Sequence, residues 1–255
     1  MLEIFSSQLF LGAAQRKLFK QGLPVFTYHS IGDPPAGARD PFLYVSKPRF
    51  AQQMTMLCEQ GFTSGSLEEL PDAKGNRDKK AVITFDDGYR NVLKNGLEIL
   101  VRHRFRAIQY IVAGIIGTRH EWDVKRGDTP EALMDEAEIR EWLAAGQEIG
   151  SHSLTHRNLS RLTAAEAREQ IGGSKKKLED TFGVSIRHFC YPGGKWTPMV
   201  RDLVREAGYA TACTTGFGVN TSQTPAFELK RIFCLSKSEM LGKVKHRIAR
   251  KLGIS

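Results

Sequence analysis

A series of short apolar segments, each followed at once by a polar side chain, constrains the fold of this chain more than any other feature. The clearest is Ala81–Phe85, which is followed directly by Asp86 and Asp87 and is typical of a buried strand whose carboxyl end opens onto a polar site. The first apolar strand candidate ends at His29 in the same way, and a later one ends at His152. Segments with helical spacing follow most of these strands.

Strands that alternate with helices favour a parallel sheet, either closed as a barrel or open and doubly wound. In a barrel the carboxyl ends of all strands converge on one face, whereas in an open sheet they are spread along an edge. Because several strands end in polar side chains that could form one site, we predict an α/β barrel of about seven parallel strands in a single domain.

Composition narrows the class of protein. The chain has 255 residues and a net charge of +9, but its basic residues are spread out and form no recognisable nucleic-acid module, so we expect no nucleic-acid partner. Four cysteines without a C-x-x-C pair fit a reducing compartment. The basic residues near the N-terminus follow its apolar segment, which is the wrong order for a signal peptide. We therefore expect a cytoplasmic protein.

Two pairs of residues indicate a metal site. Asp86 and Asp87 point in opposite directions if they end a strand, so one can bind a metal while the other faces water. His152 and His156 are four residues apart, and on a helical turn both rings reach one cation. Each pair has a plain alternative, a turn or helix cap for the carboxylates and surface positions for the histidines. Together they form a site of two histidines and one aspartate with open positions for water and substrate.

The motifs that carry these residues resemble a known family. Thr84-Phe85-Asp86-Asp87-Gly88, then His152-Ser153-Leu154-Thr155-His156, then Phe189-Cys190-Tyr191-Pro192-Gly193-Gly194 look like the polysaccharide deacetylases, carbohydrate esterase family 4. Phe26-Thr27-Tyr28-His29-Ser30-Ile31 is similar to the branch with poly-N-acetylglucosamine deacetylases. The resemblance covers roughly residues 23–235, between an amphipathic extension over residues 1–22 and a C-terminal segment over residues 236–255.

The resemblance implies a distorted (β/α) barrel and hydrolysis of an N-acetyl group on an amino sugar. It also implies a divalent metal, usually zinc, with Asp87, His152 and His156 as ligands and Asp86 as general base. These roles agree with the chemistry, because a metal lowers the pKa of bound water and a neighbouring carboxylate can accept its proton.

Two departures from the family pattern leave roles to be filled. The third motif normally has an arginine that orients the base, but the matching segment begins at Cys190, which we interpret as a small buried hydrophobe. Its Gly193 can still supply a backbone N–H to the oxyanion, and Arg231 is a candidate for orienting Asp86. The late motif lacks its usual acid histidine. We therefore name His29 as the candidate general acid, with a purely structural role as the alternative.

Aromatic side chains near the expected site are candidates for stacking on sugar rings. We expect Tyr191, Trp122 and Trp196, together with Arg231, to contact substrate, with ordinary packing as the alternative for the tryptophans. His188 lies within an apolar strand and is expected in the core or on the outer face.

The last segment of the chain has the pattern of a basic amphipathic helix. Apolar residues from Met240 to Leu252 form a stripe flanked by lysines and arginines. We expect this helix, within residues 236–255, either to pack on the barrel or to attach to an anionic membrane surface from the cytoplasmic side.

The favoured function is metal-dependent N-deacetylation of an amino sugar in a cell-surface polysaccharide or a lipid-linked glycan precursor. Two alternatives stay open: a deformylase or amidohydrolase acting on another amide, since a metal site defines the reaction better than the substrate, and a catalytically weak barrel that binds glycan.

Overall fold

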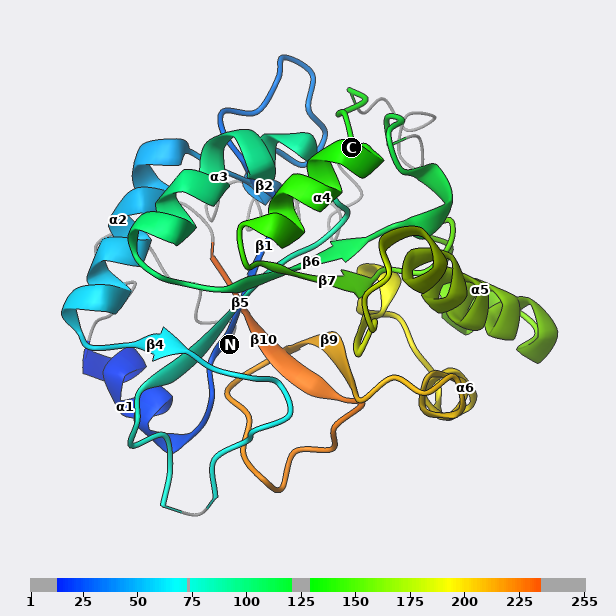
Figure 1. Ribbon diagram of the computed structural model, residues 1–255. Coiled ribbons are helices and arrows are strands. Elements are labelled where there is room, and N and C mark those ends of the chain that lie inside the picture. Colours follow the sequence, from blue (N-terminus) through cyan, green and yellow to red (C-terminus); the bar gives the residue numbers. More distant parts are fainter. Residues whose placement is uncertain (1–12, 73, 121–128, 235–255) are drawn as a thin grey trace, which may run out of the picture.

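Seven parallel strands close into a barrel in the computed structural model, which describes residues 13–72, 74–120 and 129–234 (Figure 1). Around the barrel the strands follow the order β1-β10-β9-β8-β7-β6-β5, and β5 pairs with β1 to close it. The predicted fold class is therefore confirmed. The strands are β1 Val25–Tyr28, β5 Lys80–Phe85, β6 Ala107–Ile111, β7 Glu148–Ser151, β8 His188–Cys190, β9 Thr211–Phe217 and β10 Leu229–Phe233.

Helices surround the barrel on its outer side, as Figure 1 shows. They are α1 Ala13–Gln21, α2 Lys47–Glu59, α3 Arg90–Arg102, α4 Glu136–Ala144, α5 Ala164–Phe182 and α6 Pro198–Glu206. A loop over residues 218–228 replaces the helix between β9 and β10, which makes the barrel irregular. The remaining short elements are β2 Ser30–Ile31, β3 Tyr44–Val45, β4 Thr63–Ser64 and the 3₁₀ turns Pro41–Leu43, Ala113–Ile115, Leu159–Arg161 and Pro192–Gly194.

Capping residues set the limits of the helices near the site. Asp135 and Thr163 begin α4 and α5, each in a capping box with a glutamate three residues later. α5 is continuous through Gly172 and Gly173. The absence of a side chain at Gly173 serves packing, because a Cβ there would lie 2.9 Å from the Leu154 side chain. α5 thus packs closely against the turn that carries the two histidines.

The described part of α1 packs on the barrel through Phe19. Its ring forms edge-to-face pairs with Phe26 and Phe62, with ring centres 5.5 and 6.1 Å apart. No helix among the described residues is long and apolar enough to cross a bilayer. The basic amphipathic helix expected within residues 236–255, and the first twelve residues of the expected extension, lie outside the described residues.

His188 on β8 gives the fold a pH-dependent stability. Its ring is buried, with Nδ1 2.9 Å from Thr211 Oγ1, and burial lowers its pKa to about 4 despite the opposing charge of Glu68. In the unfolded chain this histidine binds a proton near pH 6.5. The free energy of unfolding therefore keeps its full value above pH 6.5 and decreases as the pH falls towards 4. The loss expected from the shift is about 3 kcal/mol.

Replacing His188 with asparagine, which can keep the bond to Thr211, should flatten this dependence. Urea unfolding of the metal-loaded protein between pH 7.5 and 4.5 measures it. The partly exposed His103 supplies the control as His103→Asn. If the free energy of unfolding of His188→Asn changes with pH as steeply as that of His103→Asn, this account is contradicted.

Candidate active site

The carboxyl ends of the strands meet at a pocket of about 260 Å³. Its wall brings together residues that lie far apart in the sequence, as expected for one face of a parallel barrel. Six of the residues singled out from the sequence line it: His29, Asp86, Asp87, His152, His156 and Gly193.

Asp86 and Arg231 form a buried two-pronged ion pair. The guanidinium donates to Oδ1 at 2.7 Å and to Oδ2 at 2.8 Å, while its Nε donates to the Thr214 carbonyl at 2.9 Å. Burial alone would raise the pKa of Asp86, but the charge and hydrogen bonds of Arg231 outweigh it and hold that pKa well below the ordinary value. Asp86 therefore stays a carboxylate with its oxygens fixed in place.

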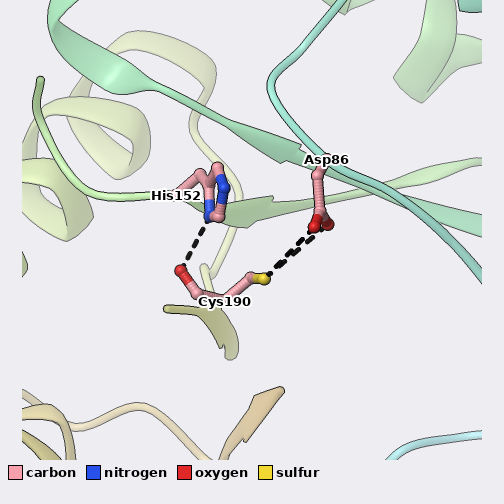
Figure 2. Close-up of side chains that lie close together, drawn as sticks. All are labelled: Asp86, His152 and Cys190. Atoms are coloured by element: carbon pink, nitrogen blue, oxygen red, sulfur yellow. Dashed lines mark hydrogen bonds between the residues drawn. The ribbon is translucent and has the colours of Figure 1, made fainter. Parts of the chain in front are cut away.

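Cys190 contacts both halves of the site from β8 (Figure 2). Its Sγ lies 3.6 and 3.7 Å from the two Asp86 oxygens, and its backbone carbonyl lies 2.8 Å from His152 Nδ1. The side chain is fully buried, and burial raises the pKa of its thiol well above the usual range. It remains a neutral thiol, in agreement with the sequence interpretation of a small buried residue rather than a nucleophile.

Asp87, His152 and His156 present a set of donor atoms that fits a divalent metal. Nε2 of His152 lies 3.5 Å and Nε2 of His156 lies 3.3 Å from Asp87 Oδ1. A carbonyl can only accept, so His152 Nδ1 carries the ring proton and Nε2 turns its lone pair towards that carboxylate. Burial lowers the pKa of both histidines, that of His156 well below its usual value, which keeps the rings neutral.

These three ligands suit zinc, which takes imidazole and carboxylate ligands and leaves a position open in catalytic sites. Their donor atoms all lie within 4.8 Å of one another. A lone pair facing a carboxylate oxygen is repulsive unless a cation lies between them, so the arrangement fits a bound cation better than an empty cluster.

A turn, not the predicted helical turn, brings the two histidines together. Ser153 and His156 adopt left-handed backbone conformations, with φ of 68° and 57°, and the rings lie 5.0 Å apart. The N–H groups of Ala113 and Gly114 donate to the Ser153 and Leu154 carbonyls at 3.0 and 2.7 Å. The loop after β6 thus holds the turn in place, and sequence spacing alone could not distinguish this turn from a helix.

His29 lies on the pocket wall beside Asp86. Its Nε2 is 3.9 Å from Asp86 Oδ2, and its ring stacks on Phe233 at 6.5 Å. The side chain is 16% exposed, so it is open to the pocket. This position is compatible with proton transfer to a group bound near Asp86.

Comparison with known proteins identifies the family. The sequence model of the family described as polysaccharide deacetylase matches residues 73–212, more than half of the chain. The chain belongs to the polysaccharide deacetylase family. This confirms the resemblance inferred from the three motifs.

Three similar proteins show how far this chain resembles its relatives. YxkH of Bacillus subtilis (strain 168) is 25% identical over 214 residues, which cover 82% of this chain and 70% of YxkH. The poly-beta-1,6-N-acetyl-D-glucosamine N-deacetylase of Escherichia coli (strain K12) is 28% identical over 132 residues, 50% of this chain and 18% of that enzyme. The crystal structure of BC0361, a polysaccharide deacetylase from Bacillus cereus, matches with a TM-score of 0.69 and 26% sequence identity. The match covers 89% of this chain and 70% of the BC0361 chain.

The structure corrects the substrate contacts that the sequence suggested. Tyr191 is fully buried and donates its hydroxyl to the Phe227 carbonyl at 3.0 Å, and Arg231 is only 1% exposed beside Asp86. Trp196 stacks on Tyr191, with ring centres 6.0 Å apart, and is not among the residues that line the pocket. Trp122 lies outside the described residues. The predictions for Tyr191 and Arg231 as substrate contacts are therefore wrong.

Other aromatic side chains line the pocket instead. They are Phe42, Tyr89 and Phe233. Phe233 follows Arg231 by two residues on β10, so strand alternation offered a signal for it. Tyr89 directly follows the Asp-Asp-Gly motif, whereas Phe42 lies in a loop rich in proline and glycine whose path no local pattern specifies.

Gly193 and Gly194 also line the pocket. Gly193 has a φ of 59°. A Cβ on Gly194 would lie 2.2 Å from Thr215 Oγ1, so this position requires glycine. The Gly194 N–H already donates to the Tyr191 carbonyl at 2.8 Å. Gly193 therefore stays the candidate for a backbone donor to the pocket.

Proposed function

We propose that this protein hydrolyses the N-acetyl group of an amino sugar in a glycan, with a divalent metal at Asp87, His152 and His156, and that this metal is zinc. The observation that carries the proposal is the placement of this donor set beside an anionic carboxylate, Asp86, in one pocket. A bound ion supplies Lewis acidity towards the amide carbonyl and water.

The protein groups divide the proton transfers between them. Asp86 accepts the proton of the attacking water, since Arg231 keeps it ionised and fixes its oxygens. A backbone N–H at Gly193 donates to the oxygen that becomes negative in the tetrahedral transition state. His29, 3.9 Å from Asp86, delivers a proton to the leaving nitrogen.

The presence of Arg231 weakens the alternative of a binding-only barrel. That alternative depended on the absence of the family's arginine and of its acid histidine, and a guanidinium from β10 contacts Asp86 in place of the first. The E. coli relative acts, by its name, on poly-beta-1,6-N-acetyl-D-glucosamine. A polymer of N-acetylglucosamine is accordingly the substrate class that we test first.

Release of acetate from N-acetylglucosamine oligomers with zinc, measured beside release of formate from N-formyl analogues, tests the proposal. We expect acetate release that a chelator abolishes and that Asp86→Asn lowers by at least about 100-fold. The surface carboxylate variant Asp202→Asn should stay active. Formate release alone would support the deformylase, and glycan binding without release of either acid would support the binding barrel.

A further inference from the structure

Side-chain oxygens hold the turn that carries the two histidines. The His156 N–H donates to Ser153 Oγ at 3.1 Å, and the Thr155 N–H donates to Gln170 Oε1 at 3.0 Å. Ser153 and His156 adopt left-handed backbone conformations, which residues with a side chain disfavour and keep only where their surroundings determine them. Contacts from outside the turn are therefore needed to maintain its shape.

Gln170 on α5 supplies the contact next to His156. Gln170 is 8% exposed, and its Oε1 accepts two hydrogen bonds from Thr155, from the N–H at 3.0 Å and from the hydroxyl at 3.0 Å. One oxygen thus fixes both the peptide plane and the side-chain rotamer of Thr155. Because Thr155 immediately precedes His156, the backbone that leads into this histidine has little freedom.

The same face of α5 supports the first half of the turn. Ser174 Oγ lies 2.7 Å from Ser151 Oγ, which accepts the Ser153 N–H at 3.3 Å. Gln170 and Ser174 are four residues apart in a continuous helix, so they lie on one face of it. α5 therefore contacts the turn at both ends, and Gln170 is its contact at the His156 end.

The two histidines of the metal site are held in different ways. The His152 ring is fixed directly, by the Cys190 carbonyl at 2.8 Å from Nδ1. Gln170 acts on His156 through the backbone instead. A ligand that is held in place before the metal arrives binds it more tightly, because less freedom is lost on binding.

We propose that Gln170 is a positioning residue of the metal site, which raises metal affinity by holding Thr155, and with it His156, in the metal-binding position. The inference rests on the metal site of the proposed function and not on its substrate. The alternative is a purely structural role, in which Gln170 contributes to folding but not to the affinity for metal.

Zinc affinity, measured by competition with a chromogenic chelator, tests the proposal. Methionine has a similar length but no oxygen, so Gln170→Met should lower zinc affinity about 10- to 100-fold. Gln170→Glu keeps the accepting oxygen and should bind zinc at least as tightly as the wild type. Thr155→Val removes only the hydroxyl and should cause a smaller loss, which keeps the test available if Gln170→Met does not fold.

Gln53 on α2 supplies a matched control, because α2 and α5 lie on different sides of the barrel (Figure 1). Gln53 is also buried, and its Oε1 accepts one hydrogen bond, from the Tyr28 hydroxyl at 3.0 Å. Gln53→Met and Gln170→Met should both lower the urea midpoint of the metal-free protein. Only Gln170→Met should lower zinc affinity.

Three results would overturn the positioning role and leave the metal site itself intact. They are wild-type zinc affinity in Gln170→Met and Thr155→Val, a loss in Gln170→Glu as large as that in Gln170→Met, and an equal loss in Gln53→Met. If the wild-type protein itself binds no zinc, the metal site of the proposed function fails, and the role of Gln170 fails with it.

Discussion

Replacing Arg231 with methionine is expected to destabilise the fold by about 3–5 kcal/mol, because it leaves the Asp86 carboxylate buried without its partner. Activity should fall with it. Without the guanidinium, burial raises the pKa of Asp86, and a protonated Asp86 cannot accept a proton. The acidic limb of kcat/KM should therefore move to higher pH. Urea unfolding and acetate release across a pH series measure the two effects separately.

Arg187 offers a matched control because it also forms a two-pronged pair, with Glu68, but at the surface. Its side chain is 54% exposed against 1% for Arg231. Exposed pairs contribute at most about 1 kcal/mol, so Arg187→Met should cost little and leave the pH profile unchanged. Arg231→Lys keeps the charge but not the two parallel hydrogen bonds of the guanidinium to Asp86, and should recover stability more than activity. Equal costs for Arg231→Met and Arg187→Met would refute this account of the base.

The fold and the clustering of Asp87, His152 and His156 could be predicted from the sequence because both depend on strong local patterns. Apolar strands that end in Asp86, His29 and His152 indicated one face where strand ends converge, and a parallel barrel necessarily brings such ends together. Because the family's arginine is absent from the third motif, the sequence also indicated that Asp86, the expected base, needed another partner. Arg231 could be named from the sequence, although it lies 145 positions away.

The direction of side chains at strand ends could not be predicted. A shift of one residue turns a side chain to the opposite face, and Tyr191 immediately follows the last residue of β8. Its ring therefore packs in the core rather than over the pocket. Phe42 could not be found either, because it reaches the pocket from a loop fixed by contacts distant in sequence, among them a bond from the Tyr44 hydroxyl to Glu131.

Replacing His156 with alanine should separate metal binding from folding. Of the two histidines it is the more exposed, at 17% of the side chain against 2% for His152, so its loss leaves a smaller cavity. His152 also holds the Cys190 carbonyl, and its removal would disturb β8. We expect the free energy of unfolding of His156→Ala to lie within about 1 kcal/mol of the wild-type value. Loss of a residue that only supports a metal ligand typically lowers metal affinity about 10- to 100-fold, so loss of His156 itself should lower zinc affinity by more than that.

Zinc content after dialysis against a competing chelator measures this effect, and acetate release at rising free zinc shows whether activity follows occupancy. His103→Ala removes a histidine at the C-terminal end of α3, outside the barrel, and should change neither the zinc content nor the release of acetate. Because Asp86 and Arg231 stay paired in His156→Ala, added zinc should restore part of the activity. Wild-type zinc affinity in His156→Ala would remove it from the ligand set, and the opposing lone pairs around Asp87 Oδ1 would then need another explanation.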